Sequence, residues 1–332
     1  VGIVACGDDG GPARVDGIEV PNGFEVGVAV DNLAGPTQIA SDGTGGFVVA
    51  ELNGGEDDGT GRVVRYRELS PGAAEVLVEG LLTPTGVAVD TNETLWIMEQ
   101  RRLTAGPLSD PTDRTVVLDE MPFNGRSQGT LTPLDDGGVL YDTSGSRDRD
   151  VPEELRPGSG SLWFLSGPEA TPVAYATGFK HAYAHTVDAD GQLWSTEMSD
   201  GRLDGDVPPD ELVRVSKGDD FGYPRCIGDR TPVAELGADG TDCDSTPPSH
   251  VLFEPRATPT SVAVAPWDPD TLLVALWNRS EIVAIPRDAT PGTASSTPIV
   301  TGDLTPQHLL ADGDRLLVTD FAGGRILVIA RS

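Results

Sequence analysis

The sequence predicts an all-β fold, a six-bladed β-propeller built from four-stranded antiparallel blades. One pattern occurs six times: a small-residue start, a short apolar strand, a Gly, Asp or Asn turn, and a second apolar strand, as in a β-hairpin. The copies lie at 36–51, 84–99, 128–143, 182–197, 259–276 and 306–320. The composition agrees, because 41 Gly and 27 Pro with only 5% aromatic residues favour many short strands joined by turns.

Further strands follow each copy, as a four-stranded blade requires. Third strands are predicted at 61–69, 114–121, 160–166, 211–216, 280–286 and 323–330. Fourth strands are predicted at 75–81, 172–178, 250–255 and 298–304. A lone blade cannot bury both of its faces, so repeats of this kind stack on their neighbours around a ring. A solenoid is the alternative, but it would need capping units and more regular spacing.

The first predicted strand, residues 24–30, stands before the first repeat with no hairpin of its own. We expect it to close the ring as the outer strand of the last blade, beside residues 323–330, because this pairing removes an exposed sheet edge. The propeller then spans residues 18–332 as a single domain, preceded by a tether at 1–17.

An insertion at about 217–249 follows the third strand of blade four and carries Cys226 and Cys243. In an exported protein two such cysteines are expected to form a disulfide, and nothing supplies the further ligands that a zinc site needs. Because it follows a third strand, the insertion should start at the rim or on the face opposite the functional face of the ring. We expect it to have a structural role. Long connections should instead share one face of the ring, the functional face, and these are 100–113, 144–158 and 198–209.

The N-terminal segment VGIVACGDDGG resembles the end of a bacterial lipoprotein signal, with small apolar residues before Cys6, which would become the lipidated first residue. The acidic, Gly-rich stretch after Cys6 suits a flexible tether. We therefore expect an exported bacterial lipoprotein, periplasmic or on the outer cell surface, whose only membrane contact is a lipid anchor on Cys6. An incidental cysteine in a ragged N-terminus is the alternative.

The charge of the chain limits its partners. With 53 Asp and Glu against 23 Lys and Arg, the formal net charge is −30. Such a surface repels phosphate backbones and anionic lipid headgroups, so we expect no nucleic-acid partner and no polybasic membrane binding. The acidity itself is read as an aid to solubility.

Alignment of the six repeats indicates which side chains converge at the centre of the ring. Four blades carry small or uncharged residues just before the first strand. Blades three and four carry basic and polar residues there: Arg126, Ser127, Gln128, Lys180 and His181. Arg256 lies nearby in blade five. In so acidic a chain, a cationic cluster at the axis indicates an anionic or electron-rich ligand. Charge compensation is the alternative.

That alternative has support, because four blades end their second strand on a carboxylate: Glu51, Glu99, Glu197 and Asp320. Some of these carboxylates are expected to pair with Arg126 and Lys180 in a purely architectural role. The segment from Asp188 to Gly191 resembles the start of a calcium loop, but hairpin turn chemistry explains it more simply. The sequence holds no serine nucleophile elbow, no phosphate-binding P-loop and no C-x-x-C-H haem motif.

Over most of residues 20–330 the chain resembles the glucose/sorbosone dehydrogenase family. The segments that carry the likeness are PNGFEVGVAVDNLAGPTQIASD, LDDGGVLYDTSGS, ATGFKHAYAHTVDADGQLW, PPDELVRVSKGDDFGYPRCIGD, WNRS and LLVTDFAGGRILVIA. Members of that family are exported six-bladed propellers that use pyrroloquinoline quinone (PQQ) and calcium to oxidise sugars. The resemblance therefore implies hydride transfer from a sugar hydroxyl carbon to PQQ, with a sugar or related polyol as substrate. Without a haem motif, electrons would leave to an external acceptor.

The resemblance also assigns residues, with departures from the family pattern. The family's general base is a His before the blade-three strand, and Ser127 stands at that position here. A serine hydroxyl is no base near neutral pH, so we expect His181 or Glu197 to take that role. Lys180 and His181 match the Arg-Asn pair that holds the quinone, and a later basic residue corresponds to Thr305.

These matches are combined with the basic and polar residues at the central opening of the ring, which we call the mouth. The expected cofactor-binding residues are then Arg126, Gln128, Lys180, Arg256 and Thr305. Calcium is expected in the acidic loop, with candidate ligands at Asp200, Asp210 and Glu211 and with Glu197 nearby. Two other functions stay open: a propeller that has lost the cofactor and binds a carbohydrate or protein, and a metal-dependent lyase or lactonase that uses the carboxylate ring.

Overall fold

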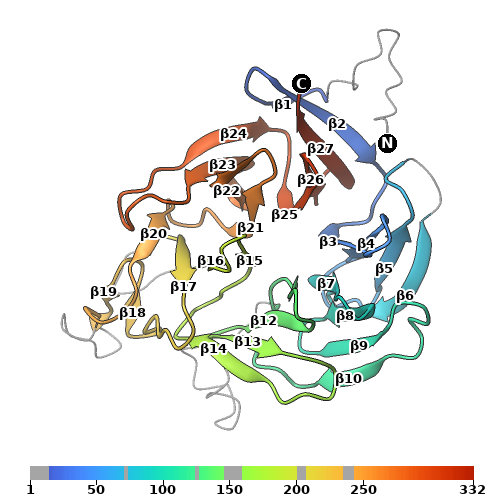
Figure 1. Ribbon diagram of the computed structural model, residues 1–332, viewed down its shortest axis with the longest axis horizontal. Helices are drawn as coiled ribbons and strands as arrows, with labels where there is room; N and C mark the ends of the chain where they lie inside the picture. The colour runs from blue at the N-terminus through green and yellow to red at the C-terminus, as the bar shows by residue number, and fades with distance from the viewer. Residues whose placement is uncertain (1–14, 71–73, 124–126, 146–158, 200–206, 235–242) are drawn as a thin grey trace.

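The computed structural model is a six-bladed β-propeller, as predicted (Figure 1). It describes residues 15–70, 74–123, 127–145, 159–199, 207–234 and 243–332. Within these residues the strands form six antiparallel blade sheets around a central axis, and one further small sheet belongs to the insertion. No helix in the described residues is both long and apolar enough to cross a membrane. Cys6, the predicted site of lipid attachment, lies outside the described residues.

The blades follow one another in chain order. Blade one holds β3 (Pro36–Ser41), β4 (Phe47–Glu51), β5 (Gly61–Tyr66) and β6 (Glu75–Leu81). Blade two holds β7 (Gly86–Val89), β8 (Thr94–Met98), β9 (Leu103–Pro107) and β10 (Thr115–Leu118). Blade three holds β11 (Thr132–Pro133), β12 (Val139–Thr143), β13 (Ser161–Leu165) and β14 (Val173–Thr177).

The second half of the ring is built in the same way. Blade four holds β15 (His185–Val187), β16 (Leu193–Glu197), β17 (Glu211–Val215) and β20 (Ser249–Leu252). Blade five holds β21 (Pro259–Ala265), β22 (Asp268–Leu276), β23 (Glu281–Pro286) and β24 (Thr297–Gly302). Blade six holds β25 (Pro306–Asp312), β26 (Arg315–Asp320), β27 (Arg325–Arg331) and β2 (Phe24–Val30).

The N-terminal strand closes the ring, which confirms the prediction from the unpaired first strand. Strand β2 pairs antiparallel with β27, and Val26 stands opposite Ile329. Chain segments from the two ends of the sequence thus complete one blade (Figure 1). A further strand, β1 (Ile18–Glu19), adds to the outer edge of β24. With only two residues, it leaves no periodic pattern from which it could be predicted.

One strand assignment was wrong. The third strand of blade two is β9, and the segment at 114–121 contains the fourth strand, β10, instead. Residues 100–113 are therefore not one long loop. The segment LTAGP has only two large apolar side chains and ends on Pro107, which hid it from a search for apolar alternation. Leu103 is nevertheless fully buried, in the cluster between blades two and three.

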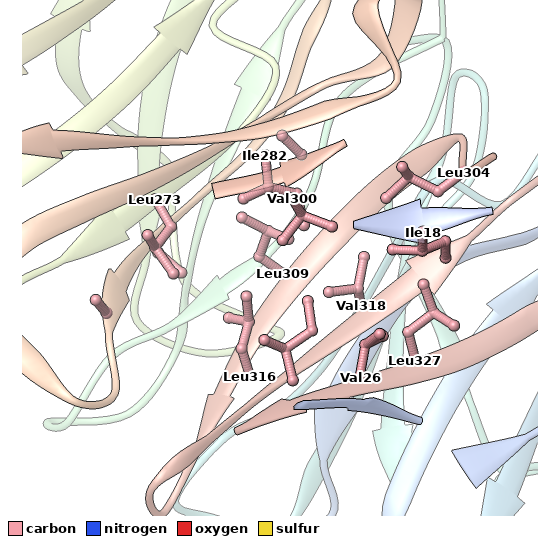
Figure 2. Packing of buried hydrophobic residues seen from close by; sticks show 14 residues of the cluster. Ile18, Val26, Leu273, Ile282, Val300, Leu304, Leu309, Leu316, Val318 and Leu327 are labelled. Carbon is pink, nitrogen blue, oxygen red and sulfur yellow. The ribbon is translucent and has the colours of Figure 1, made fainter. Parts of the chain in front are cut away.

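The core lies between neighbouring blades, because each of the larger clusters of buried side chains draws on two adjacent sheets, while a small one lies within the insertion. The largest contains Leu273 and Ile282 of blade five together with Leu309, Leu316 and Leu327 of blade six (Figure 2). This face-to-face packing is the physical reason that one blade alone would not fold.

The Asp turns of the hairpins are capped by their own carboxylates. In blades two and four, Asp90 and Asp188 each accept hydrogen bonds from two backbone N–H groups of the turn. Their second oxygens accept from the indole Nε1 of Trp96 at 2.9 Å and of Trp194 at 3.0 Å. The Asp188 carboxylate is thus used in the hairpin, which favours turn chemistry over a calcium loop.

The insertion is held by the predicted disulfide between Cys226 and Cys243, with 5.5 Å between their Cα atoms. It carries the small sheet of β18 (Cys226–Ile227) and β19 (Thr231–Pro232). Its first part packs against blade three, where Phe221 stacks on Phe179 at 4.4 Å between ring centroids. It then returns to the start of β17, since Gly228 and Asp229 approach Glu211 through their backbone N–H groups.

Two histidines near the axis predict a loss of stability in acid. Burial lowers the pKa of His185 to about 4, and burial together with the charge of His185 lowers the pKa of His308 to about 3. The His185 Nδ1 lies 2.7 Å from the Thr132 hydroxyl, and the His308 Nδ1 is enclosed although the residue as a whole is half-buried.

Because both folded-state pKa values lie below the unfolded value of about 6.5, their stabilising contribution is intact above that pH. It is lost as the pH falls from about 6.5 through about 4, by about 2 kcal/mol per histidine between pH 7 and pH 5. Buried carboxylates with raised pKa oppose this trend, so the test is a comparison. His308→Asn should lose less free energy of unfolding than wild type over this range in urea titrations; equal losses would refute the argument.

Candidate functional site

The ends of the second strands and the starts of the first strands meet on one face of the ring. Three carboxylates at the strand ends accept a hydrogen bond from a backbone N–H just before the first strand of the same blade. These bonds join Glu99 to Leu82 at 2.8 Å, Glu197 to Lys180 at 2.6 Å and Asp320 to Thr305 at 2.8 Å. The carboxylates at the strand ends therefore serve largely to fix the backbone of each blade near the centre of the ring.

Arginines of the same blades neutralise most of these carboxylates. Arg62 lies 2.6 Å from Glu51 and Arg325 lies 2.7 Å from Asp320, while Arg114 approaches Glu99 at 3.9 Å. The expected partners were Arg126 and Lys180. Of these, Arg126 lies outside the described residues, and Lys180 meets Glu197 through its backbone N–H and its charge.

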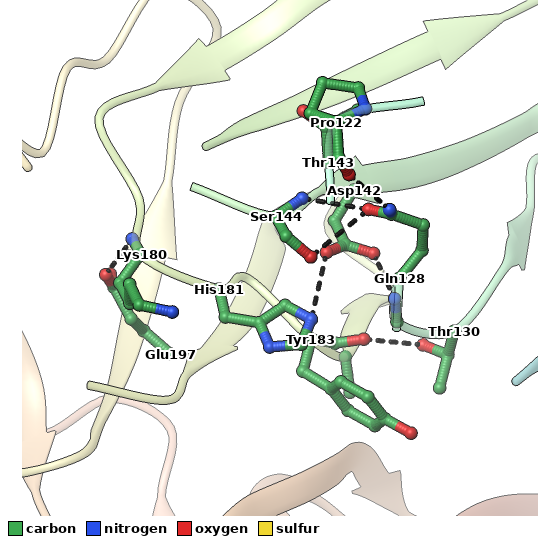
Figure 3. A network of polar contacts seen from close by, with 12 residues as sticks. Pro122, Gln128, Thr130, Asp142, Thr143, Ser144, Lys180, His181, Tyr183 and Glu197 are labelled. Atoms are coloured by element: carbon green, nitrogen blue, oxygen red, sulfur yellow. Dashed lines mark hydrogen bonds and ion pairs between the residues drawn. The ribbon is translucent and has the colours of Figure 1, made fainter. Parts of the chain in front are cut away.

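A buried imidazole–carboxylate pair stands at the mouth between blades three and four (Figure 3). The Nε2 of His181 lies 3.5 Å from the Oδ2 of Asp142, and both side chains are buried. The other oxygen of Asp142 accepts from the backbone N–H of Gly129 at 2.6 Å. Burial raises the pKa of Asp142 well above its ordinary value. The imidazole and the carboxyl lie close enough for a proton on one group to change the charge that the other meets.

Sequence reasoning found His181 but missed Asp142. The signal was a charged residue inside the second strand of blade three, VLYDT, where the other blades carry apolar or small side chains. Gly129 completes the arrangement, since a Cβ there would lie 1.9 Å from the Tyr183 carbonyl oxygen. The missing side chain thus lets blade four approach Asp142 closely.

Gln128 supports this site from behind. It is fully buried, and its amide donates to the carbonyl oxygens of Pro122 at 2.6 Å and Gln100 at 3.1 Å. Its carbonyl oxygen accepts from the backbone N–H of Ser144 at 2.9 Å (Figure 3). The structure thus uses Gln128 to hold the segments around Asp142. Ser127, beside it, is half-buried.

The remaining expected cofactor residues are spread around the mouth. Lys180 is half-buried and adjoins His181 in the chain. Arg256 is exposed, and its carbonyl oxygen accepts from the Asn278 amide at 3.1 Å in blade five. Thr305 is half-buried in blade six. Lys180 and Arg256 carry the positive charges that an anionic quinone would need, while the His181 imidazole is buried against Asp142.

Two of the acidic residues face a common cavity. Glu197 and Glu211 line a space of about 10 Å³, with room for about one water or ion. The insertion contributes Gly228, Asp229, Arg230 and Thr246 to its lining. Burial raises the pKa of both carboxyls, and the charge of Glu211 raises that of Glu197 further. A hard divalent cation would relieve this repulsion, whereas Arg230 in the lining and the backbone N–H groups of Gly228 and Asp229, which approach Glu211, already offset part of it.

Asp210, another predicted metal ligand, does not line this cavity. Asp210 accepts from the backbone N–H groups of Ser199 and Thr258, both at 2.8 Å, and so joins blade four to blade five. Asp200 lies outside the described residues. Among the residues that the structure describes, no group of three or more His, Cys, Asp or Glu side chains is arranged to hold a metal.

Solved structures share this fold over nearly the whole chain. The chain is similar to a Trichoderma reesei enzyme of carbohydrate-active family AA12, with 18% identity, a TM-score of 0.77 and coverage of 97% of this chain and 99% of that one. It is also similar to the holo PQQ domain of pyranose dehydrogenase from Coprinopsis cinerea, with 16% identity, a TM-score of 0.76 and coverage of 97% and 99%.

A third similar structure is the PQQ-bound aldose sugar dehydrogenase of Streptomyces coelicolor, with 17% identity, a TM-score of 0.68 and coverage of 94% and 99%. No protein-family model matches the chain, and neither does any curated protein. The chain therefore has the propeller fold of PQQ-dependent sugar dehydrogenases, as the resemblance in the sequence implied. Its low sequence identity to them is that of a divergent chain.

Proposed function

We propose that this protein is a quinone-dependent sugar dehydrogenase in which His181, paired with Asp142, is the general base. The observation that carries the proposal is this buried pair at the mouth of the ring, next to Lys180. It supplies a proton acceptor one blade along from Ser127, where the family resemblance led us to seek one. The fold shared with PQQ-dependent sugar dehydrogenases supports the general class.

In the proposed reaction a sugar hydroxyl gives its proton to His181 as its carbon–oxygen bond becomes a carbonyl. Asp142 lies 3.5 Å from the imidazole and, in its ionised form, would stabilise the imidazolium that forms. When bound, PQQ supplies the two-electron acceptor for the hydride that leaves the same carbon. Lys180, with Arg256, would hold the anionic quinone, and an external acceptor would take the electrons onward.

The direct test is reconstitution of the purified protein with PQQ and calcium, followed by dye reduction with a panel of aldoses and polyols. Dye reduction that needs both the sugar and PQQ is the expected result. Dye reduction that is the same with and without PQQ would contradict the proposal.

We further propose that calcium binds between Glu197 and Glu211. At a hundred-fold excess over its Kd, calcium should raise the Tm by roughly 3–5 °C. Glu211→Gln should abolish this shift, because it removes one of the two charges that the ion neutralises. Glu51→Gln is the matched control, since that carboxylate lies on the same face but binds Arg62. A full calcium shift in Glu211→Gln would place the ion elsewhere.

We also propose that the protein is exported and anchored to a membrane through a lipid on Cys6. The lipoprotein-like sequence before Cys6 supports this, and so does a disulfide, which persists in oxidising compartments. Metabolic labelling with a fatty acid would test it, with Cys6→Ser as the unlabelled control.

A carbohydrate-binding propeller without the cofactor is the second candidate. It is favoured by the neutral side chains of Ser127 and Thr305, at positions where the family resemblance implies a histidine and a basic residue. It predicts sugar binding with no dye reduction, and Ser127→His alone should not restore activity.

A further inference from the structure

Two aromatic rings meet on the functional face, at the border of blades five and six. Trp277 begins the 3₁₀ turn Trp277–Arg279 directly after β22, and Phe321 follows directly after β26. Their ring centroids are 4.9 Å apart with an angle of 51° between the planes. Both side chains are half-buried, so each ring keeps part of its surface exposed.

The two rings stand at the same position in their blades as the residue that follows Glu197 in the blade of His181. The backbone N–H of Trp277 donates to the Thr258 carbonyl at 3.0 Å, and that of Phe321 donates to the Thr305 carbonyl at 2.9 Å. In blade four the equivalent bond runs from Met198 to the His181 carbonyl at 3.0 Å. Trp277 and Phe321 therefore occupy the positions that Met198 occupies next to Glu197.

The mouth is thus polar on one side and aromatic on the other. Blades three and four contribute Asp142, Lys180 and His181. On the other side the Phe321 ring covers Gly35 of blade one so closely that a Cβ there would lie 3.2 Å from it. Because Gly35 also has φ +66°, a side chain at this position would be both crowded and strained.

Polar groups flank the ring pair. The Asn278 amide donates to the Thr258 hydroxyl at 2.7 Å, which places an amide and a hydroxyl beside Trp277. In the described part of the chain, the indole Nε1 of the half-buried Trp277 donates to no other group. Flat apolar faces edged by hydrogen-bonding groups match a pyranose, whose C–H face stacks on aromatic rings while its hydroxyls point sideways.

We propose that Trp277 and Phe321 form a stacking subsite for a second sugar ring, so that the ligands of this protein are oligosaccharides. The choice of which sugar unit reacts rests on the proposed function. The terminal unit would lie at His181, and the next unit would lie at the aromatic pair. The subsite itself depends only on the ring pair and its polar edge.

The test is calorimetric titration, without quinone, of the whole protein with cellopentaose, xylopentaose and maltopentaose, and with glucose and xylose. Trp277→Ala and Phe321→Ala should each raise the Kd for the preferred pentasaccharide roughly ten-fold, and change the Kd for its monosaccharide less than about two-fold. Trp267→Ala is the matched control. Trp267 pairs with Phe24 at 4.8 Å, but between β21 and β22, at the opposite end of the blade.

Three results would overturn the subsite: no pentasaccharide binding by the wild type, an unchanged Kd in both ring variants, or an equal loss in Trp267→Ala. Since these titrations contain no quinone, pentasaccharide binding together with failed reconstitution would refute the proposed oxidation and leave the subsite standing.

Discussion

His181→Asn should lower kcat for sugar oxidation by about 10²- to 10⁴-fold, because it removes the proton acceptor from the mouth. Asn keeps a polar side chain at this buried position, and a melting profile separates any loss of folding from the loss of catalysis. Rates of dye reduction under saturating PQQ, calcium and sugar are the measurement. Asp142→Asn should reduce kcat as well and shift its pH dependence, since the imidazolium loses the carboxylate that stabilises it.

Ser127→Ala is the matched control for this experiment. Ser127 stands at the position of the family's base, but its hydroxyl cannot serve as one near neutral pH. Its loss should change kcat less than about three-fold, far less than the loss of His181. If Ser127→Ala abolished oxidation while His181→Asn left it intact, the base would have been assigned to the wrong blade.

Val26→Asp should destabilise the protein by about 3–5 kcal/mol, the largest stability effect that we expect from one substitution. Val26 lies in β2, the strand that closes the ring, and only 8% of its surface is exposed within the cluster that joins blades five and six. An unpaired carboxylate buried there would oppose ring closure directly. The free energy of unfolding from urea titration is the measurement.

Val28→Asp provides the comparison, because it introduces the same charge into the same strand at a position that is 37% exposed. Its expected cost is within about 1 kcal/mol, mainly from the low strand propensity of Asp. Equal destabilisation by both variants would mean that the charge itself matters rather than burial at the closing strand. Two mild variants would mean that ring closure contributes little to stability.

Much of the fold was predictable because a propeller repeats its local pattern. Hairpin periodicity located the two inner strands of every blade, and the solitary segment at 24–30 indicated how the ring closes. Strands β1 and β9 were missed for a physical reason. The first has two residues and the second has few apolar side chains, so their existence depends on neighbouring strands rather than on their own sequence.

The site was harder to predict, since its contacts join different blades. Lys180 and His181 stood out against bland residues in the other blades. Asp142 also departs from the apolar or small residues of the other blades, but its partner comes from blade four and no sequence spacing encodes that contact. Glu197 and Glu211 were both seen as acidic, but only the fold brings them to one cavity while Asp210 joins blade four to blade five.

The central claim is that the mouth of this propeller binds a quinone for sugar oxidation. Titration of the purified protein with PQQ in the presence of calcium tests it most directly, with absorbance and melting temperature as readouts. We predict a saturable, stoichiometric change in the quinone spectrum and a rise in Tm, both weakened by Lys180→Ala. Neither a spectral change nor a Tm shift at saturating PQQ and calcium would contradict the claim.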